Sequence, residues 1–202
     1  MISQVIGLAQ HFSSNIVSIE TKLLFPWSKL QPGMLPIFSW IFLNNLNVSP
    51  SPDIVVSCGR KSVYLSIYLK KKFKNIINIH IQNPKINFQN FNFIIAPEHD
   101  RIRGNNVISS IGALHKFTKK TIEDQMDLFF HIPKKKLISV LIGGNNHHYK
   151  FSVKEINKLS LKIQNMKKAY PEYNFLILSS RRTTHEMKKI IKEILEKIAI
   201  IW

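Results

Sequence analysis

The residues best suited to chemistry follow two apolar runs in the second half of the sequence. Gly143-Gly144 comes after the run 137–142, and a glycine turn lets backbone N–H groups approach a phosphate. Arg181-Arg182 comes after the run 175–178, and guanidinium groups bind phosphate or carboxylate in a bidentate way. Only five of the 29 basic residues are arginines, so an adjacent pair favours a function. The pattern indicates an anion site, although a simple strand-to-helix turn also explains the two glycines.

A third stretch combines acid and base. Glu98, His99 and Asp100 follow the apolar run 91–96. An imidazole beside carboxylates is a common arrangement for proton transfer. We predict these three as catalytic residues, with His99 or Asp100 as the base. The alternative is a histidine that only hydrogen-bonds its own loop.

Two other reactive residue types give weaker signals. His147-His148 has no evident third ligand, and neighbouring side chains on an extended loop point apart, so no metal site is predicted. Cys58 has no paired histidine in its sequence context and is interpreted as a small buried residue.

The elements that must position these residues alternate between strands and helices. Strands are predicted at 16–19, 53–57, 76–81, 91–96, 107–110, 137–142 and 175–178, with a last one starting at 198. Helices are predicted at 2–12, 62–72, 152–168 and 185–197, with others ending near 46 and opening at Thr121. This rhythm favours an α/β fold with parallel sheets in two units. Ligands of such sheets bind beyond the carboxyl ends of the strands.

Composition limits the class of protein. The chain has 202 residues, 45% of them hydrophobic, and a formal net charge of +17. The excess lysine is spread along the chain, and Ile, Asn and Lys share AT-rich codons. We therefore expect a bacterial, AT-rich genome and no specific nucleic-acid partner. A single cysteine excludes an intrachain disulfide. No apolar run approaches the ~20 residues of a membrane span, and no secretory signal is evident. A cytoplasmic location is expected.

Eight short motifs occur in an order that resembles a known family. They are Gln4 with Gly7-Leu8-Ala9, Gly59-Arg60, Gln82 with Pro84, Pro97 with His99-Asp100, Gly104 with Asn106-Val107, Gly112-Ala113-Leu114, Leu141 to Gly144 with Tyr149, and Ser180-Arg181-Arg182-Thr183. The chain resembles the mitochondrial-fission "elongated mitochondria" family of plants and its bacterial relatives, which are often labelled nucleoside-diphosphate-sugar epimerase-like.

The resemblance implies a GT-B-like architecture, in which two Rossmann-like domains face each other across a cleft. It implies binding of a nucleotide-diphosphate sugar, with possible transfer of the sugar and no further cofactor. The implied diphosphate contacts are Gly143, Gly144, Tyr149, Ser180, Arg181, Arg182 and Thr183, helped by the dipole of helix 152–168. The implied cleft lining is Gly59, Arg60, Gln82, Pro84, Gly104 and Asn106.

Compared with the family pattern, the chain is expected to lack a first strand and the later half of the second domain. The predicted domains are 1–130 and an incomplete 131–202, and a neighbouring reading frame is expected to supply missing segments. Two alternatives to a glycosyltransferase-like enzyme stay open. One is a non-enzymatic adaptor in peripheral contact with an anionic membrane, and the other is a nonfunctional gene fragment. A fold of this kind does not by itself establish catalysis.

Overall fold

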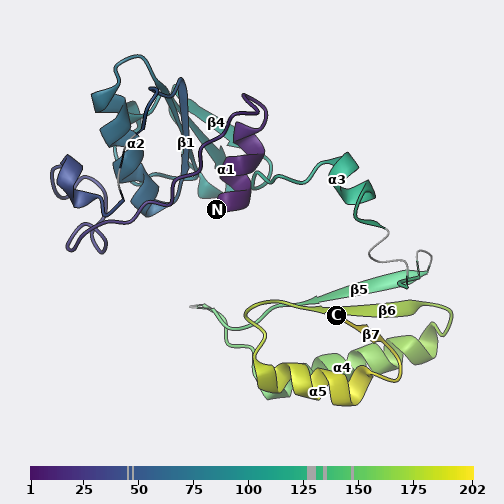
Figure 1. Ribbon diagram of the computed structural model, residues 1–202. Coiled ribbons are helices and arrows are strands. Elements are labelled where there is room, and N and C mark those ends of the chain that lie inside the picture. Colours follow the sequence, from purple (N-terminus) through teal and green to yellow (C-terminus); the bar gives the residue numbers. More distant parts are fainter. Residues whose placement is uncertain (45, 47, 127–130, 134–135, 147) are drawn as a thin grey trace. The chain divides into compact units, whose positions relative to one another are not determined.

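The chain forms two compact units, Met1–Thr121 and Ile122–Trp202 (Figure 1). The computed structural model describes residues 1–44, 46, 48–126, 131–133, 136–146 and 148–202. Both units are α/β with parallel strands, which confirms the predicted fold class. The domain ranges 1–130 and 131–202 stay predictions.

The first unit is built on a parallel sheet with strand order β1-β2-β3-β4. These strands are β1 (Ile54–Cys58), β2 (Ile77–Ile81), β3 (Phe93–Pro97) and β4 (Val107–Ser110). Each lies within about two residues of its predicted position. Helix α2 (Arg60–Lys72) makes the crossover between the first two strands. The carboxyl ends of β1, β2 and β3 therefore share one edge of the sheet, where ligands of such sheets bind.

Helix α2 has two buried faces. Val63 and Ile67 pack with Ile94 of β3 against one face of the sheet. Tyr64 and Leu65 belong to a second core together with the long segment before β1. A helix buried on two sides needs apolar residues around most of its circumference. The 63–69 stretch provides them, while the three lysines at 70–72 follow in the last turn.

The opposite face of the first sheet is only partly covered. The short helix α1 (Ile2–Ala9) packs against β1. Farther across the sheet, Ile77, Phe93 and Ile108 stay exposed. Their pairing register places them on the side away from α2.

The segment 13–53 differs from its prediction. Residues 16–19 form no strand, and Val17 is exposed. Instead of a helix to residue 46, the described residues of this stretch contain one 3-10 turn, η1 (Ser39–Ile41). The segment folds around Trp27, whose indole N–H donates to the Pro36 carbonyl oxygen at 2.9 Å. Tertiary packing around this buried indole overrides the local periodicity.

The second unit agrees closely with its prediction. Its sheet has the order β5-β6-β7, with β5 (Leu137–Ile142), β6 (Asn174–Ser179) and β7 (Ile200–Ile201). Helix α4 (Val153–Ala169) and helix α5 (His185–Leu195) both lie on one face (Figure 1). The short helix α3 (Lys119–Glu123) precedes the sheet and begins two residues before Thr121, because Thr118 provides its cap.

The core of the second unit lies between its sheet and its two helices. Alternate residues of β5 and β6 point into this core, among them Val140, Ile142 and Ile177. They meet Ile156 of α4 and Ile191 of α5. On the other face Leu141 is 78% exposed. Leu176, on the same face, is buried, so Leu141 is an exposed residue on a face that is otherwise partly covered.

Candidate functional site

The loops after β5 and β6 are tied together by one threonine. The Thr183 hydroxyl oxygen lies 2.6 Å from the Gly143 carbonyl oxygen and 3.1 Å from that of Ile142. It also accepts a hydrogen bond from the Ser180 backbone N–H at 3.0 Å. Thr183 is buried. The two predicted anion-binding loops therefore form one rigid junction at the carboxyl edge of the sheet.

The two glycines of this junction are not equivalent. A Cβ atom added to Gly144 would lie 1.9 Å from the Arg182 carbonyl oxygen and 2.2 Å from its carbon. A Cβ atom added to Gly143 would have no heavy atom within 4 Å. Only position 144 needs glycine for close approach of the two backbones.

The loop that follows is shaped by two asparagines. The Asn146 side-chain oxygen accepts hydrogen bonds from the backbone N–H groups of His148 and Tyr149, at 2.8 and 2.6 Å. The Asn145 side-chain oxygen accepts one from Phe151 at 2.6 Å. Such side-chain bonds stabilise tight turns. Asn145 follows the predicted strand 137–142, but neither asparagine was assigned a role from the sequence, although the Asn-Asn pair directly after two glycines was a usable turn signal.

A pocket of about 280 Å³ opens at this junction. Its wall includes Gly144, Tyr149, Phe151, Leu159 and Arg182. The rings of Tyr149 and Phe151 are stacked, with centroids 6.1 Å apart and planes inclined by 29°. The pocket thus combines an aromatic and aliphatic wall with a cation at its rim.

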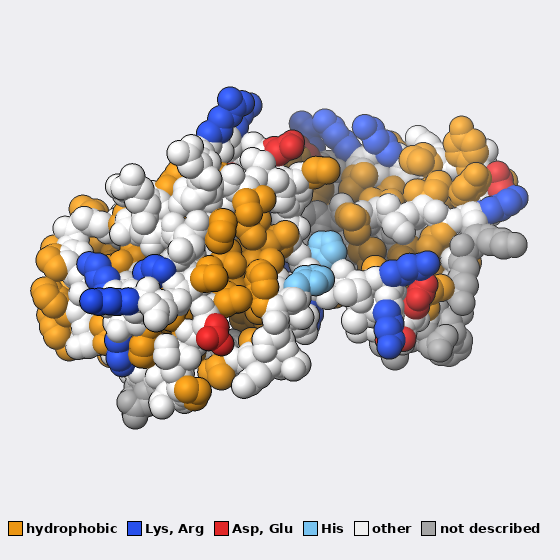
Figure 2. All heavy atoms as spheres, turned by 90° about the horizontal axis from the view of Figure 1, so that it is seen from above, with side chains coloured by type: hydrophobic (Ala, Val, Ile, Leu, Met, Phe, Trp, Pro, Cys, Tyr) orange, Lys and Arg blue, Asp and Glu red, His pale blue; other side chains and the backbone are white. Residues whose placement is uncertain are grey.

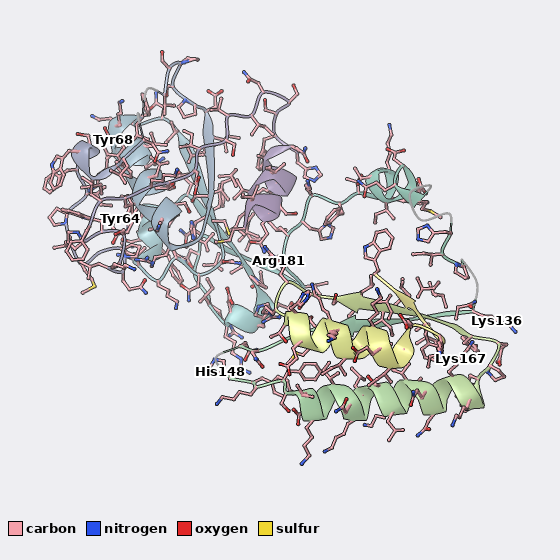
Figure 3. All side chains as sticks on the ribbon, turned by 60° about the horizontal axis from the view of Figure 1, so that its bottom comes forward. Tyr64, Tyr68, Lys136, His148, Lys167 and Arg181 are labelled. Atoms are coloured by element: carbon pink, nitrogen blue, oxygen red, sulfur yellow. The ribbon has the colours of Figure 1, made fainter. Side chains whose placement is uncertain are left out.

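Both arginines are available to a ligand. Arg181 and Arg182 are exposed. Among the residues that the structure describes, neither guanidinium group has a hydrogen-bond or ion-pair partner. Arg181 and His148 lie at the same end of the unit, away from Lys136 and Lys167 at the amino end of β5 (Figure 3). Two unpaired cations therefore stand at the carboxyl edge.

The expected help from the dipole of helix 152–168 is not supported. The N-terminus of α4 carries a capping box, in which Glu155 accepts hydrogen bonds from the Ser152 hydroxyl and backbone N–H. The hydrogen bond from the Ser152 side chain lowers the pKa of Glu155. An ionised carboxylate already occupies this helix terminus and repels a second anion.

In the first unit, Glu98, His99 and Asp100 form one 3-10 turn, η3 (Glu98–Asp100), directly after β3. The His99 ring nitrogen Nε2 lies 3.7 Å from the Asp100 carboxylate, and the imidazole is largely exposed. This distance is too long for a hydrogen bond. The three consecutive residues share this turn, and among the described residues no hydrogen bond fixes the imidazole; their catalytic role stays a prediction.

The residues after β1 and β2 mostly bond to the protein itself. Gly59 has a φ of 92° at the start of α2, a conformation that favours glycine. The Arg60 guanidinium donates to the carbonyl oxygens of Ser28 and Leu30. Pro84 is buried in the loop after β2. Arg60 and Pro84 therefore hold loops in place.

Gln82 belongs to a polar cluster that sequence reasoning missed. Its side-chain nitrogen donates to the Gln4 side-chain oxygen at 3.2 Å, and the Cys58 thiol donates to the same oxygen at 3.2 Å. Gln82 also has a φ of 77°. Cys58 is half-buried and not simply a filler, and burial raises the pKa of its thiol.

The structure does not bring Gly104 and Asn106 to this edge. Asn106 comes just before β4, and its side-chain amide donates to the carbonyl oxygens of Phe88 and Phe91 at 2.8 and 2.9 Å. Gly104 lies in the same turn. A connection between two parallel strands must return to the amino edge of the sheet. These two residues thus lie at the opposite edge from Gly59 and Gln82.

The model of the family described as "Mitochondrial fission ELM1" matches residues 1–202. The chain belongs to the mitochondrial fission ELM1 family. This confirms the resemblance drawn from the eight motifs.

Two further proteins are similar to this ELM1-family chain. The uncharacterized protein RP120 of Rickettsia prowazekii is 30% identical over 174 residues, which cover 70% of this chain and 49% of RP120. The chain thus spans about half the length of this curated relative. Among solved structures, a UDP-GlcNAc 2-epimerase from Neisseria meningitidis, bound to UDP-GlcNAc, is 19% identical. The superposition covers 74% of this chain and 48% of the epimerase, with a TM-score of 0.43.

Within the described ranges, no group of three or more His, Cys, Asp or Glu side chains is placed to hold a metal ion. His147, from the His147-His148 pair, lies outside the described residues. Nor does any described helix combine the length and apolarity that crossing a membrane requires.

Proposed function

We propose that this ELM1-family chain binds a nucleotide-diphosphate sugar at the junction of the loops after β5 and β6. One observation carries the proposal. Arg182 lines a pocket beside the close contact of Gly144, its neighbour Arg181 is exposed next to it, and neither guanidinium group has a partner among the described residues. The residues assigned to the ligand are Gly143, Gly144, Tyr149, Ser180, Arg181, Arg182 and Thr183.

The chemistry of the junction favours a phosphorylated ligand. Charge-assisted bonds from guanidinium to phosphate are about twice as strong as neutral ones and add geometric specificity. Two adjacent arginines match the two phosphate groups of a diphosphate better than a single carboxylate. The hydrogen bond from the Thr183 hydroxyl to the Gly143 carbonyl oxygen, called here the Thr183 latch, holds the loop after β6 at a fixed distance from Gly143. Little ordering of this loop is therefore needed when the ligand binds.

The volume of the pocket limits which part of the ligand it holds. Pockets for drug-sized ligands measure roughly 300–1,000 Å³, and this one measures about 280 Å³. It therefore accommodates one ring of a nucleotide sugar and not the whole molecule. Tyr149 and Phe151 offer an aromatic surface for stacking of the base, and this orientation leaves the phosphates at the arginines.

The proposal is one of binding. Transfer of the sugar needs a base, and Glu98, His99 and Asp100 are the proposed candidates. A positioned base normally has an orienting partner within hydrogen-bond distance. The 3.7 Å between His99 and Asp100 exceeds that distance. Turnover is therefore a separate question from binding.

Calorimetric titration with a panel of UDP-, GDP- and CMP-sugars tests the proposal. We expect one nucleotide class to bind the wild-type protein, and the R181A/R182A variant to lose at least about a hundredfold in affinity. The matched control is K162A/K168A, which removes two exposed cations from α4 of the same unit and should bind as the wild type does. Unchanged affinity in R181A/R182A would overturn the assignment.

A further inference from the structure

The first unit has a pocket of its own, between the last turn of α2 and the 3-10 turn η2 (Phe88–Asn90). It measures about 200 Å³. Two buried residues, Ile67 and Phe91, form the apolar part of its wall. The rest of the wall is polar and consists of Lys70, Lys71, Gln89, Asn90 and Asn92. Residues 89–92 lead into β3, so the pocket lies at the amino edge of the sheet.

One buried asparagine holds the polar wall in place. Asn78 of β2 and Asn92 exchange two hydrogen bonds, each from a backbone N–H group to the side-chain oxygen of the other residue at 3.0 Å. The Asn78 side-chain nitrogen also donates to the Asn90 carbonyl oxygen at 2.9 Å. Asn78 itself is buried. The wall is therefore fixed before any ligand binds, which lowers the ordering cost of binding.

Several polar groups of this wall have no partner in the protein. Among the described residues, the side chains of Lys71 and Gln89 and the side-chain nitrogen of Asn92 make no hydrogen bond or ion pair. Lys70 donates to the Ile76 carbonyl oxygen and keeps further N–H donors on its ammonium group. Lysine and amide donors without protein acceptors thus line one small hollow.

The charge around the pocket is positive and uncompensated. From residue 54 to residue 97 the sequence contains seven basic residues and no Asp or Glu. The carboxylates of Glu98 and Asp100 come directly after β3 and therefore lie at the opposite edge of the sheet. Figure 2 shows lysine and arginine side chains in the left half of the first unit, where Figure 1 places α2. The local field favours an anion.

We propose that this pocket binds a sugar phosphate, that is, a small phosphorylated compound with one hydroxylated ring. The ammonium groups of Lys70 and Lys71 bind the phosphate. The amides of Gln89 and Asn92 bond to ring hydroxyls, because amides and hydroxyls both donate and accept. Pockets for drug-sized ligands measure roughly 300–1,000 Å³, so this smaller one holds a single ring, packed on Phe91. The site is independent of the proposed nucleotide site.

Calorimetric titration with glucose 6-phosphate, ribose 5-phosphate, glucose and inorganic phosphate tests the proposal. We expect saturable binding of at least one of the two sugar phosphates, at least about tenfold tighter than binding of glucose or inorganic phosphate. The reason is that only a sugar phosphate engages the lysines and the amides together. The proposal is overturned if neither sugar phosphate binds, or if glucose or inorganic phosphate binds equally well.

Paired variants locate the binding. K71A/Q89A removes two side chains without protein partners, so the fold should be kept while sugar phosphate affinity falls at least about tenfold. The matched control is K61A/Q31A, which removes an exposed lysine and an exposed glutamine elsewhere in the same unit and should bind as the wild type does. Equal losses in the two variants would show nonspecific attraction and would contradict the proposal.

A further variant separates this site from the proposed nucleotide site. R181A/R182A should bind the sugar phosphate normally, even though it is expected to lose nucleotide binding. Hydrogen exchange gives an independent reading, because the bound sugar phosphate should slow exchange in peptides that cover residues 88–92. Protection confined to residues 179–184, or loss of sugar phosphate binding in R181A/R182A, would place the ligand in the second unit and refute the assignment.

Discussion

The contact between Gly144 and the Arg182 backbone gives a sharp prediction for one methyl group. In Gly144→Ala the new Cβ atom starts 1.9 Å from the Arg182 carbonyl oxygen, whereas ordinary contact begins near 3.4 Å. The two backbones must therefore separate by about 1.5 Å. The Arg182 carbonyl cannot rotate away as a side chain would, since Thr183 fixes the next residue to the Gly143 carbonyl oxygen at 2.6 Å.

The expected loss in the free energy of unfolding lies at the upper end of the range for overpacked substitutions. Forced insertion of a methylene group typically costs about 1–3 kcal/mol, and loss of the Thr183 bonds adds about 1 kcal/mol. For a unit of this size a loss of 3 kcal/mol lowers Tm by more than about 10 °C. Because the same shift moves both arginines, nucleotide affinity should fall together with stability.

Gly143→Ala is the matched control. Its Cβ atom would meet no heavy atom within 4 Å, so its stability should stay within about 0.5 kcal/mol of the wild type. Hydrogen exchange of the β5 and β6 peptides, read by mass spectrometry, measures stability in the second unit alone. If Gly144→Ala and Gly143→Ala show the same protection as the wild type, the close approach described here is wrong.

Three other predictions concern single side chains. Burial lowers the pKa of His80 to about 4 from the ordinary 6.5. Between these two pH values the unfolded chain binds a proton at His80 more readily than the folded chain does. The free energy of unfolding should therefore fall as pH drops from 6.5 towards 4, by up to about 1.4 kcal/mol per pH unit. Urea unfolding across that range should show a smaller slope in His80→Gln, and equal slopes would contradict the assignment. Asn106→Ala leaves two carbonyl oxygens without their donor and should destabilise the first unit by about 1–3 kcal/mol in urea, which a change below 0.5 kcal/mol would exclude. Thr183→Val should weaken nucleotide binding by at least about tenfold in calorimetry, whereas Thr183→Ser keeps the hydroxyl and should bind normally; equal affinities would show that the latch is dispensable.

Sequence reasoning worked where local signals and tertiary packing agree. Strand 137–142 is apolar, and helix α4 begins after a serine three residues before a glutamate, so pattern and cap predict the same boundaries. It failed at 16–19 and 37–46, where Trp27 organises the segment through contacts distant in sequence. Apolar periodicity carries no information on such contacts.

In the candidate site, too, features set by local sequence signals could be predicted, and features set by contacts distant in sequence could not. The loops after β5 and β6 were predictable, because the carboxyl ends of neighbouring parallel strands share one edge. The sequence prediction put Asn106 at the carboxyl edge because it counted this residue with those that follow β3. At Asn106 the chain has already returned to the amino edge of the sheet, where β4 begins. The Thr183 latch, with partners about 40 residues away in sequence, requires knowledge of the pairing register.

Each unit has apolar core clusters of its own, Tyr64 and Ile94 in the first and Phe175 and Ile177 in the second. Cooperativity in unfolding follows shared cores, so heat absorption should resolve into two transitions rather than one. A ligand raises only the transition of the unit that binds it. A scanning calorimetry trace with and without the nucleotide therefore assigns the binding site to one half of the chain, with no substitution in the protein at all.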